Sequence, residues 1–149
     1  ISDLEKPDFA RTLSHGLKSL VKFDYTVIFG YVGTTRPLAL FDDFTADRRI
    51  LHVDQYLEGP YLLDPFFLAS TGKIEPGLWR LGEIAPDRFY QGEYFRSYYA
   101  QTGLAEEIGY LININENLSI VVSLMSPAVT RSFSRYGSMY CLIADSICS

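Results

Sequence analysis

Residues 106–125 carry the pattern that most constrains the fold of this chain. From Glu106 to Ile114 apolar and aromatic side chains occupy every second position, which is the period of a β-strand. Residues 115–117, Asn-Glu-Asn, supply a turn, and Leu118 to Met125 return as a second strand. The pattern predicts an antiparallel hairpin, in which Ser123 is a hydroxyl on an otherwise apolar strand. A bond to a neighbouring backbone group is the structural alternative to a binding role for this hydroxyl.

The first third of the chain predicts a helix and a second hairpin. Apolar residues at helical spacing indicate a helix from Asp8 to Val21. Strands are expected over Tyr25 to Val32 and Leu38 to Phe44, and the short turn between them favours an antiparallel pair. Asp47 to Tyr56 returns to a helical period.

The remaining segments are predicted to be helices and one long loop. A short helix begins at Asp64-Pro65 within residues 61–69, because proline and a carboxylate suit the first helical turn. Gly72 to Ala85 is expected to be a loop that carries Trp79, Pro86 to Thr102 a helix, and Phe133 to Ile147 a last amphipathic helix. This order predicts one α+β domain over residues 1–149. We expect an α-β-α sandwich with a central antiparallel sheet of about five strands and helices on both faces.

Composition narrows the class of function. The net charge of −5 and the isoelectric point near 4.9 leave no basic face for DNA. No apolar run reaches the ~20 residues of a membrane span, and no signal sequence is visible, so a cytoplasmic protein without membrane contact is expected.

Neither catalysis nor a metal site is expected from the sequence. The two histidines and the distant Cys141 and Cys148 offer too few ligands for a metal site. Neighbouring carboxylates such as Glu106 and Glu107 point to opposite faces of a strand, so they do not form a catalytic pair. We predict no enzyme activity, no metal and no cofactor.

The segment from Tyr56 to Trp79 is the candidate pocket wall. Half of the 22 aromatic residues lie between Tyr56 and Tyr99. Asp64 sits among them, and a carboxylate in such surroundings must be solvated, paired or bound to a partner. A helix cap with nothing bound is the simpler interpretation of Asp64. The other candidate ligand-binding side chains of this segment are Tyr61 and Phe67.

Several short motifs in this order resemble one known family. They are Tyr61-Leu62-Leu63-Asp64-Pro65, Trp79 fifteen residues after Asp64, Phe95-Arg96-Ser97-Tyr98-Tyr99, Gly103-Leu104, Glu107-Ile108-Gly109-Tyr110 and Val122-Ser123-Leu124. Over residues 45–148 the chain resembles the N-terminal sensory domain of LuxR-type transcription regulators. The resemblance implies a sandwich related to PAS and GAF domains, a homodimer and a role in quorum sensing. It also implies DNA binding through a separate helix-turn-helix domain, which this chain does not contain.

The resemblance also implies binding residues. In the acyl-homoserine-lactone sensors of that family, residues matching Asp64, Trp79 and Ser123 bind the ligand amide, its ring end and its oxygens. A Trp and a Tyr that clamp the ligand carbonyls are replaced here by Leu51 and Gln55, and Tyr56 lies one position away. The carbonyls would lose two donors, at about 1–3 kcal/mol for each buried unmet bond. We therefore expect an amphipathic ligand other than an acyl-homoserine lactone, between the sheet and the helices. The alternative is a ligand-independent dimerisation module with a closed pocket.

Overall fold

The computed structural model describes residues 7–127. The helix predicted from Phe133 to Ile147, with Cys141 and Cys148, lies outside these residues. No helix within the described range is long and apolar enough to cross a lipid bilayer.

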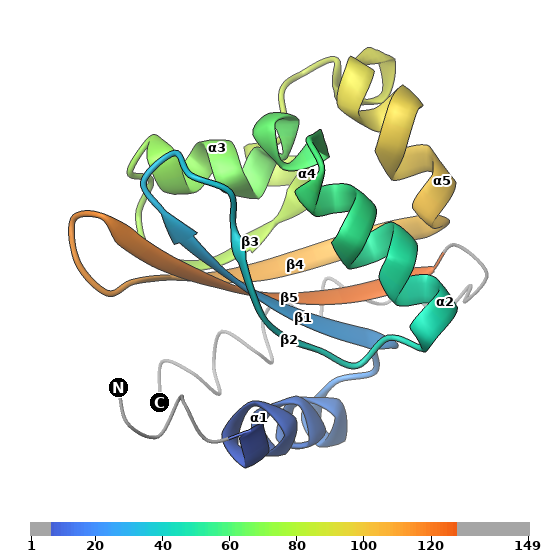
Figure 1. Cartoon of the computed structure of the whole chain (residues 1–149), viewed down its shortest axis with the longest axis vertical. Coiled ribbons are helices and arrows are strands. Elements are labelled where there is room, and N and C mark those ends of the chain that lie inside the picture. Colours follow the sequence, from blue (N-terminus) through green and yellow to red (C-terminus); the bar gives the residue numbers. More distant parts are fainter. Residues whose placement is uncertain (1–6, 128–149) are drawn as a thin grey trace.

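One antiparallel sheet forms the middle of the domain. Its five strands stand in the order β2-β1-β5-β4-β3 (Figure 1). They are β1 (Tyr25–Val32), β2 (Leu38–Asp42), β3 (Gly77–Arg80), β4 (Leu104–Asn113) and β5 (Leu118–Pro127). Both predicted hairpins are confirmed: β1 pairs with β2, and β4 pairs with β5. The second hairpin also pairs with β1 through β5, which places the two hairpins side by side in the sheet.

Helices cover both faces of this sheet (Figure 1). On one face lies α1 (Pro7–Leu20), which is held to the sheet by a buried bond of 2.8 Å between the hydroxyls of Ser14 and Thr26. The other face carries the remaining helical elements: α2 (Ala46–Arg49), η1 (Ile50–Gln55), η2 (Pro60–Leu63), α3 (Pro65–Thr71), α4 (Leu81–Ile84), η3 (Phe89–Gln91), η4 (Phe95–Tyr99) and α5 (Ala100–Thr102). The α+β sandwich expected from the sequence is therefore confirmed.

The alternation along β4 and β5 divides the apolar side chains into two cores. Ile108, Val122 and Leu124 face α1, whereas Leu111 and Val121 face the larger group of helices. A strand sends successive side chains to opposite faces, so each arm of the hairpin contributes to both cores.

Gly109 on β4 lets α3 approach the sheet closely. A Cβ atom at this position would lie only 2.3 Å from Cε1 of Phe66, which is almost fully buried. The missing side chain therefore sets the height of α3 above β4, and with it the position of Asp64 at the start of that helix.

The prediction of a loop from Gly72 to Ala85 was wrong. This segment contains the edge strand β3 and the short helix α4, because the backbone from Gly77 to Arg80 pairs with β4. The backbone N–H of Arg80 then donates to Oε2 of Glu83 at 2.8 Å, which caps α4. Pairing and capping thus order a segment whose glycines and proline are typical of a loop.

The prediction of one helix from Pro86 to Thr102 was also wrong. The backbone is extended at Gly92, which separates the short turn η3 from the helical turns of η4 and α5. The predicted end is correct, since Gly103 takes the left-handed conformation (φ 69°) that favours glycine.

Candidate functional site

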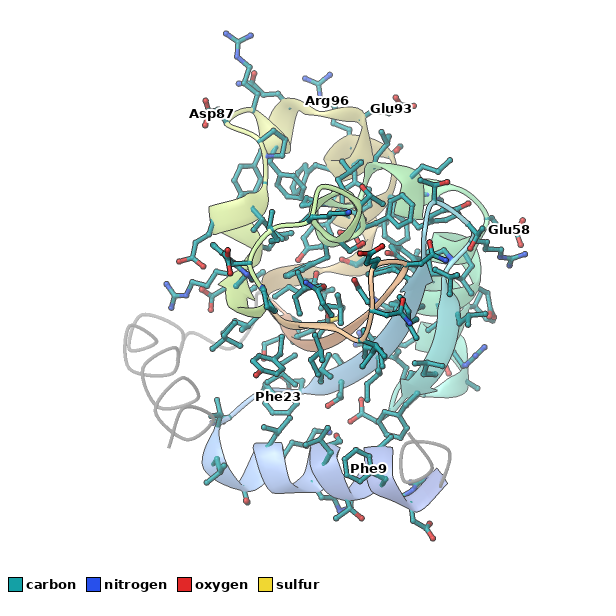
Figure 2. All side chains as sticks on the ribbon, turned by 90° about the vertical axis from the view of Figure 1, so that its left-hand side faces the viewer. Phe9, Phe23, Glu58, Asp87, Glu93 and Arg96 are labelled. Atoms are coloured by element: carbon teal, nitrogen blue, oxygen red, sulfur yellow. The ribbon has the colours of Figure 1, made fainter. Side chains whose placement is uncertain are left out.

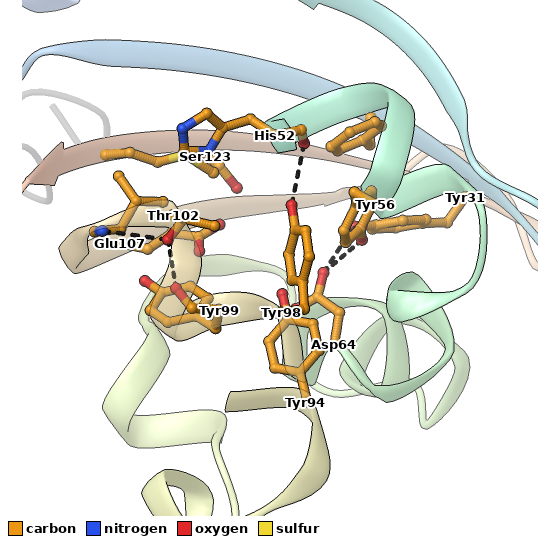
Figure 3. Close-up of a pocket in the computed structure, with 13 residues that line it drawn as sticks. Tyr31, His52, Tyr56, Asp64, Tyr94, Tyr98, Tyr99, Thr102, Glu107 and Ser123 are labelled. Atoms are coloured by element: carbon orange, nitrogen blue, oxygen red, sulfur yellow. Dashed lines mark hydrogen bonds between the residues drawn. The ribbon is translucent and has the colours of Figure 1, made fainter. Parts of the chain in front are cut away.

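A small cavity lies between the sheet and the helices of its more covered face (Figure 3). Its volume is about 20 Å³, enough for roughly one water molecule. The lining is aromatic and polar: Phe29, Tyr31, His52, Tyr56, Asp64, Tyr94, Tyr98, Tyr99, Thr102, Leu104, Glu107, Ser123 and Met125. We call this cavity and its lining the chamber.

Asp64 lies at the start of α3 and is buried in the chamber wall. Its Oδ1 accepts the backbone N–H of Phe66 at 3.0 Å, so the residue caps the helix as the sequence suggested. Its Oδ2 accepts the hydroxyl of Tyr56 at 2.5 Å and that of Tyr31 at 3.4 Å. The hydroxyls of Tyr31 and Tyr56 are 2.9 Å apart, so two phenols and one carboxyl form a closed network (Figure 3).

Burial dominates the acidity of Asp64. It raises the pKa of this carboxyl to about 6, while the bonds from Tyr56 and Phe66 lower the pKa. A carboxylate that has lost water needs such donors to remain charged. At neutral pH Asp64 is therefore mostly ionised, because its pKa of about 6 lies about one unit lower.

Glu107 on β4 is the second buried carboxyl of the chamber. Burial, followed by the charge of Asp64, raises its pKa to about 8, and a hydrogen bond from Ser123 lowers it. Glu107 therefore holds its proton at neutral pH, when Asp64 has already lost its own. The chamber thus contains two carboxyls with different protonation states.

The bases and hydroxyls around these acids are mostly neutral or internally bonded. Burial, followed by the charge of Arg48, lowers the pKa of His52 to about 4, so this imidazole is neutral at physiological pH. Tyr98 donates to the backbone oxygen of Leu51 at 3.1 Å. The hydroxyl of Tyr99, in contrast, is buried with no hydrogen-bond partner among residues 7–127. A molecule bound in the chamber could form a hydrogen bond with this hydroxyl.

The six predicted binding residues do not all reach the chamber. Tyr56, Asp64 and Ser123 line it together. Phe67 packs behind them, edge-on to Tyr61 with ring centres 5.2 Å apart, and neither ring lines the cavity. Trp79 lies on the edge strand β3, where its Nε1 donates to the backbone oxygen of Glu75 at 2.9 Å. The expected tryptophan wall is therefore absent from the chamber in this arrangement.

Sequence reasoning missed several of the residues that make the chamber polar. Chief among them are Tyr31 on β1, Tyr99 at the end of η4 and Glu107 on β4. Glu107 was recognisable, because it is a charged residue on the strand face that it shares with Gly109 and Leu111. No comparable signal in the sequence marks Tyr31 of β1 as a chamber residue.

A larger groove lies outside the chamber. Its volume is about 580 Å³, and it is lined by Arg80, Leu81, Gly82, Glu83, Ala85, Pro86, Asp87, Phe89, Tyr90, Ala105, Glu106 and Glu107. Glu107 belongs to the lining of both spaces. Glu107 is therefore the residue that the chamber and the outer groove share.

The five-stranded antiparallel sheet with helices on both faces defines a fold class, the α-β-α sandwich. A solved structure with this fold is the VqsR ligand-binding domain from Pseudomonas aeruginosa. The TM-score is 0.76 at 23% sequence identity, over 98% of this chain and 85% of that one. At this identity the likeness establishes the fold, as the sequence resemblance implied. No protein-family model matches the chain, and no curated protein matches it.

Proposed function

We propose that this chain is the small-molecule-sensing and dimerisation domain of a LuxR-type transcription regulator, and that it acts in the cytoplasm. The observation that carries the proposal is the polar chamber inside an otherwise apolar core. The shared fold of the VqsR ligand-binding domain supports it, as does the order of short motifs around Asp64.

The composition of the chamber is costly for a domain that needs only a packed core. Asp64 and Glu107 are both removed from water, and the Tyr99 hydroxyl is unsatisfied. Burying polar groups without full compensation destabilises a fold, so apolar residues would serve packing better. A binding role explains why these side chains converge.

Ligand entry requires the chamber to enlarge. Small-molecule sites typically occupy about 300–1,000 Å³, far more than the chamber volume of about 20 Å³. The groups that would have to move are Tyr31 and Tyr56, whose bonds to Asp64 hold the wall closed. A ligand that binds only the open form shifts the population toward it and stabilises the domain by mass action. In a homodimer this shift would be passed to the DNA-binding part of the regulator.

An acyl-homoserine lactone remains a poor candidate. Tyr56, rather than Gln55, faces the chamber, and its hydroxyl already serves Asp64. Leu51 offers its backbone oxygen to Tyr98 and no side-chain donor. Two donors for the carbonyls of such a ligand are therefore missing from the chamber wall.

A ligand-independent dimerisation module is the second candidate. The observation in its favour is the small volume of the chamber, with Asp64 satisfied from within. In this case the tyrosines serve as the permanent filling of the core.

Native mass spectrometry of the purified domain separates the two candidates. The sensory proposal expects a small molecule to remain bound after gentle purification and to raise the melting temperature when added back. Asp64→Asn should reduce this retention, whereas Asp24→Asn, an exposed change of the same kind outside the chamber and the outer groove, should not. Bare protein in both measurements would favour the dimerisation module.

A further inference from the structure

The two chamber acids point to the chemical class of the ligand. We propose that the sensed molecule is a small organic cation, whose protonated amine lies at Glu107 and Asp64 while its organic part lies in the outer groove. This inference rests on the proposed sensory function and adds to it the charge and the direction of entry.

Among residues 7–127, no lysine or arginine lines the chamber to neutralise its acids. The imidazole that these residues contribute to the lining, that of His52, is neutral. Asp64 approaches from the start of α3 and Glu107 from β4. The titratable and polar side chains that line the chamber with them are Tyr31, His52, Tyr56, Tyr94, Tyr98, Tyr99, Thr102 and Ser123. Buried carboxylates are normally paired with cations. The missing partner can be supplied by a ligand.

The remaining walls of the chamber suit a cation. Tyr94, Tyr98 and Tyr99 surround the space between the acids (Figure 3), and the faces of aromatic rings attract ammonium groups. Tyr99 carries the unpaired buried hydroxyl, whose oxygen can accept an ammonium N–H. The cavity already holds the volume of one water molecule, which is also the size of a protonated amine head. The cavity therefore has room for the charged head alone, and the walls must move to let it enter.

The outer groove extends the same chemistry toward solvent. The lining contributed by residues 7–127 contains the carboxylates of Glu83, Asp87 and Glu106 and the cationic side chain of Arg80. The volume of about 580 Å³ suits a small organic molecule. A surface of one charge concentrates ligands of the opposite charge, so cations would be drawn toward Glu107.

Binding of a cation must change the protonation of the chamber. Glu107 carries its proton in the empty domain at neutral pH, because burial and the charge of Asp64 raise its pKa to about 8. A positive head beside this carboxyl favours the ionised form. Up to one proton should therefore leave Glu107 for each cation bound, which a neutral ligand would not cause.

The test uses three probes of equal length: hexylammonium, 1-hexanol and hexanoate. We expect hexylammonium alone to raise the melting temperature. Calorimetry near pH 7, in two buffers with different ionisation enthalpies, should show proton release from the wild-type protein. If hexanol or hexanoate raises the melting temperature as much as hexylammonium does, the proposal of a cationic ligand is wrong, while the proposed sensory function still stands. If none of the three probes raises the melting temperature, the proposal of a cationic ligand is also wrong. Bare protein in native mass spectrometry would then contradict the sensory function as well.

A matched pair of variants assigns the charge to Glu107. Glu107→Gln keeps the size and the hydrogen-bonding capacity of the side chain, and should weaken hexylammonium binding by about tenfold or more and abolish the proton release. Glu93→Gln makes the same change on the outer surface, where Glu93 points away from the domain (Figure 2), and should leave both unchanged. Unaltered binding by Glu107→Gln would overturn the proposal. The proton release of the wild-type protein remains a valid test if this variant does not fold.

Discussion

The hydroxyl oxygen of Tyr56 lies 2.5 Å from Oδ2 of Asp64, and this bond joins the C-cap residue of η1 to the N-cap residue of α3. It satisfies a buried carboxylate and ties the two walls of the chamber together. The pair therefore contributes to stability.

Replacing Tyr56 by phenylalanine should destabilise the domain by about 1.5–3 kcal/mol, the usual range for a hydrogen bond to a charged group. The pKa of Asp64 should rise further, because the Tyr56 bond lowers it. Urea unfolding and an NMR titration of the carboxyl measure the two effects. Tyr90→Phe is the control, since Tyr90 is 72% exposed. Equal losses in both variants would show that the buried bond contributes nothing.

Stability should fall as the pH rises from 6.5 to 8. The folded-state pKa of Glu107, about 8, lies above its ordinary value of 4.5, so the native state retains a proton that the unfolded chain has lost. A raised pKa contributes stability that disappears as the pH passes through the folded value. The loss over this window should be about 1–2 kcal/mol.

The pH window separates Glu107 from its neighbours. His52, whose pKa is lowered to about 4, reduces the stability of the protein only as the pH falls below 6.5. Asp64, whose pKa is about 6, is already mostly ionised at pH 6.5. Urea unfolding at several pH values should show that Glu107→Gln removes the slope and Glu93→Gln retains it. An unchanged slope in Glu107→Gln would assign the titration to another group.

Gly109→Ala should destabilise the protein by about 1–3 kcal/mol or more, because the new methyl group would overlap the ring of Phe66. Gly16→Ala on α1 is the matched control. A Cβ there meets nothing within 4 Å, so the variant should gain up to about 1 kcal/mol from helix propensity. Chemical denaturation of both variants measures the difference. A neutral Gly109→Ala would mean that α3 can move away from the sheet at no cost.

Trp79→Phe should cost about 0.5–1.5 kcal/mol, for the bond from Nε1 to the backbone oxygen of Glu75. It should leave the affinity for hexylammonium unchanged, since Trp79 lines neither the chamber nor the outer groove. Thermal melting and calorimetry check both statements. A tenfold loss of affinity would place Trp79 in the binding site after all.

The hairpin of β4 and β5 was predictable because its strands are long and β4 alternates, and the hairpin of β1 and β2 because a short turn joins two segments that suit strands, the first of them rich in β-branched and aromatic residues. The period of two is visible in β4 and β5 and directly assigns residues to each face of the sheet. The edge strand β3 has only four residues, too few for a period to appear, and its order comes from pairing with β4. Local sequence signals do not contain that pairing.

The chamber was predictable only in part, for a related reason. Asp64 stands out in the sequence because of the proline that follows and the aromatics around it. Its bonds to Tyr31 and Tyr56 bring together residues 33 and 8 positions away. The second acid, Glu107, comes from β4, and its meeting with Asp64 depends on the height of α3 over the sheet. Side-chain convergence of this kind is a property of the tertiary fold.

The phenols of the chamber give the domain a built-in optical reporter. Burial, reinforced by the carboxyl of Asp64, raises the pKa of five tyrosines, Tyr31, Tyr56, Tyr94, Tyr98 and Tyr99. These rings cannot become tyrosinate while they remain packed. In an alkaline titration their near-ultraviolet absorbance should therefore appear in one late step, at the pH where the interior opens. The same signal would measure how firmly a bound molecule keeps the domain shut, without any added label.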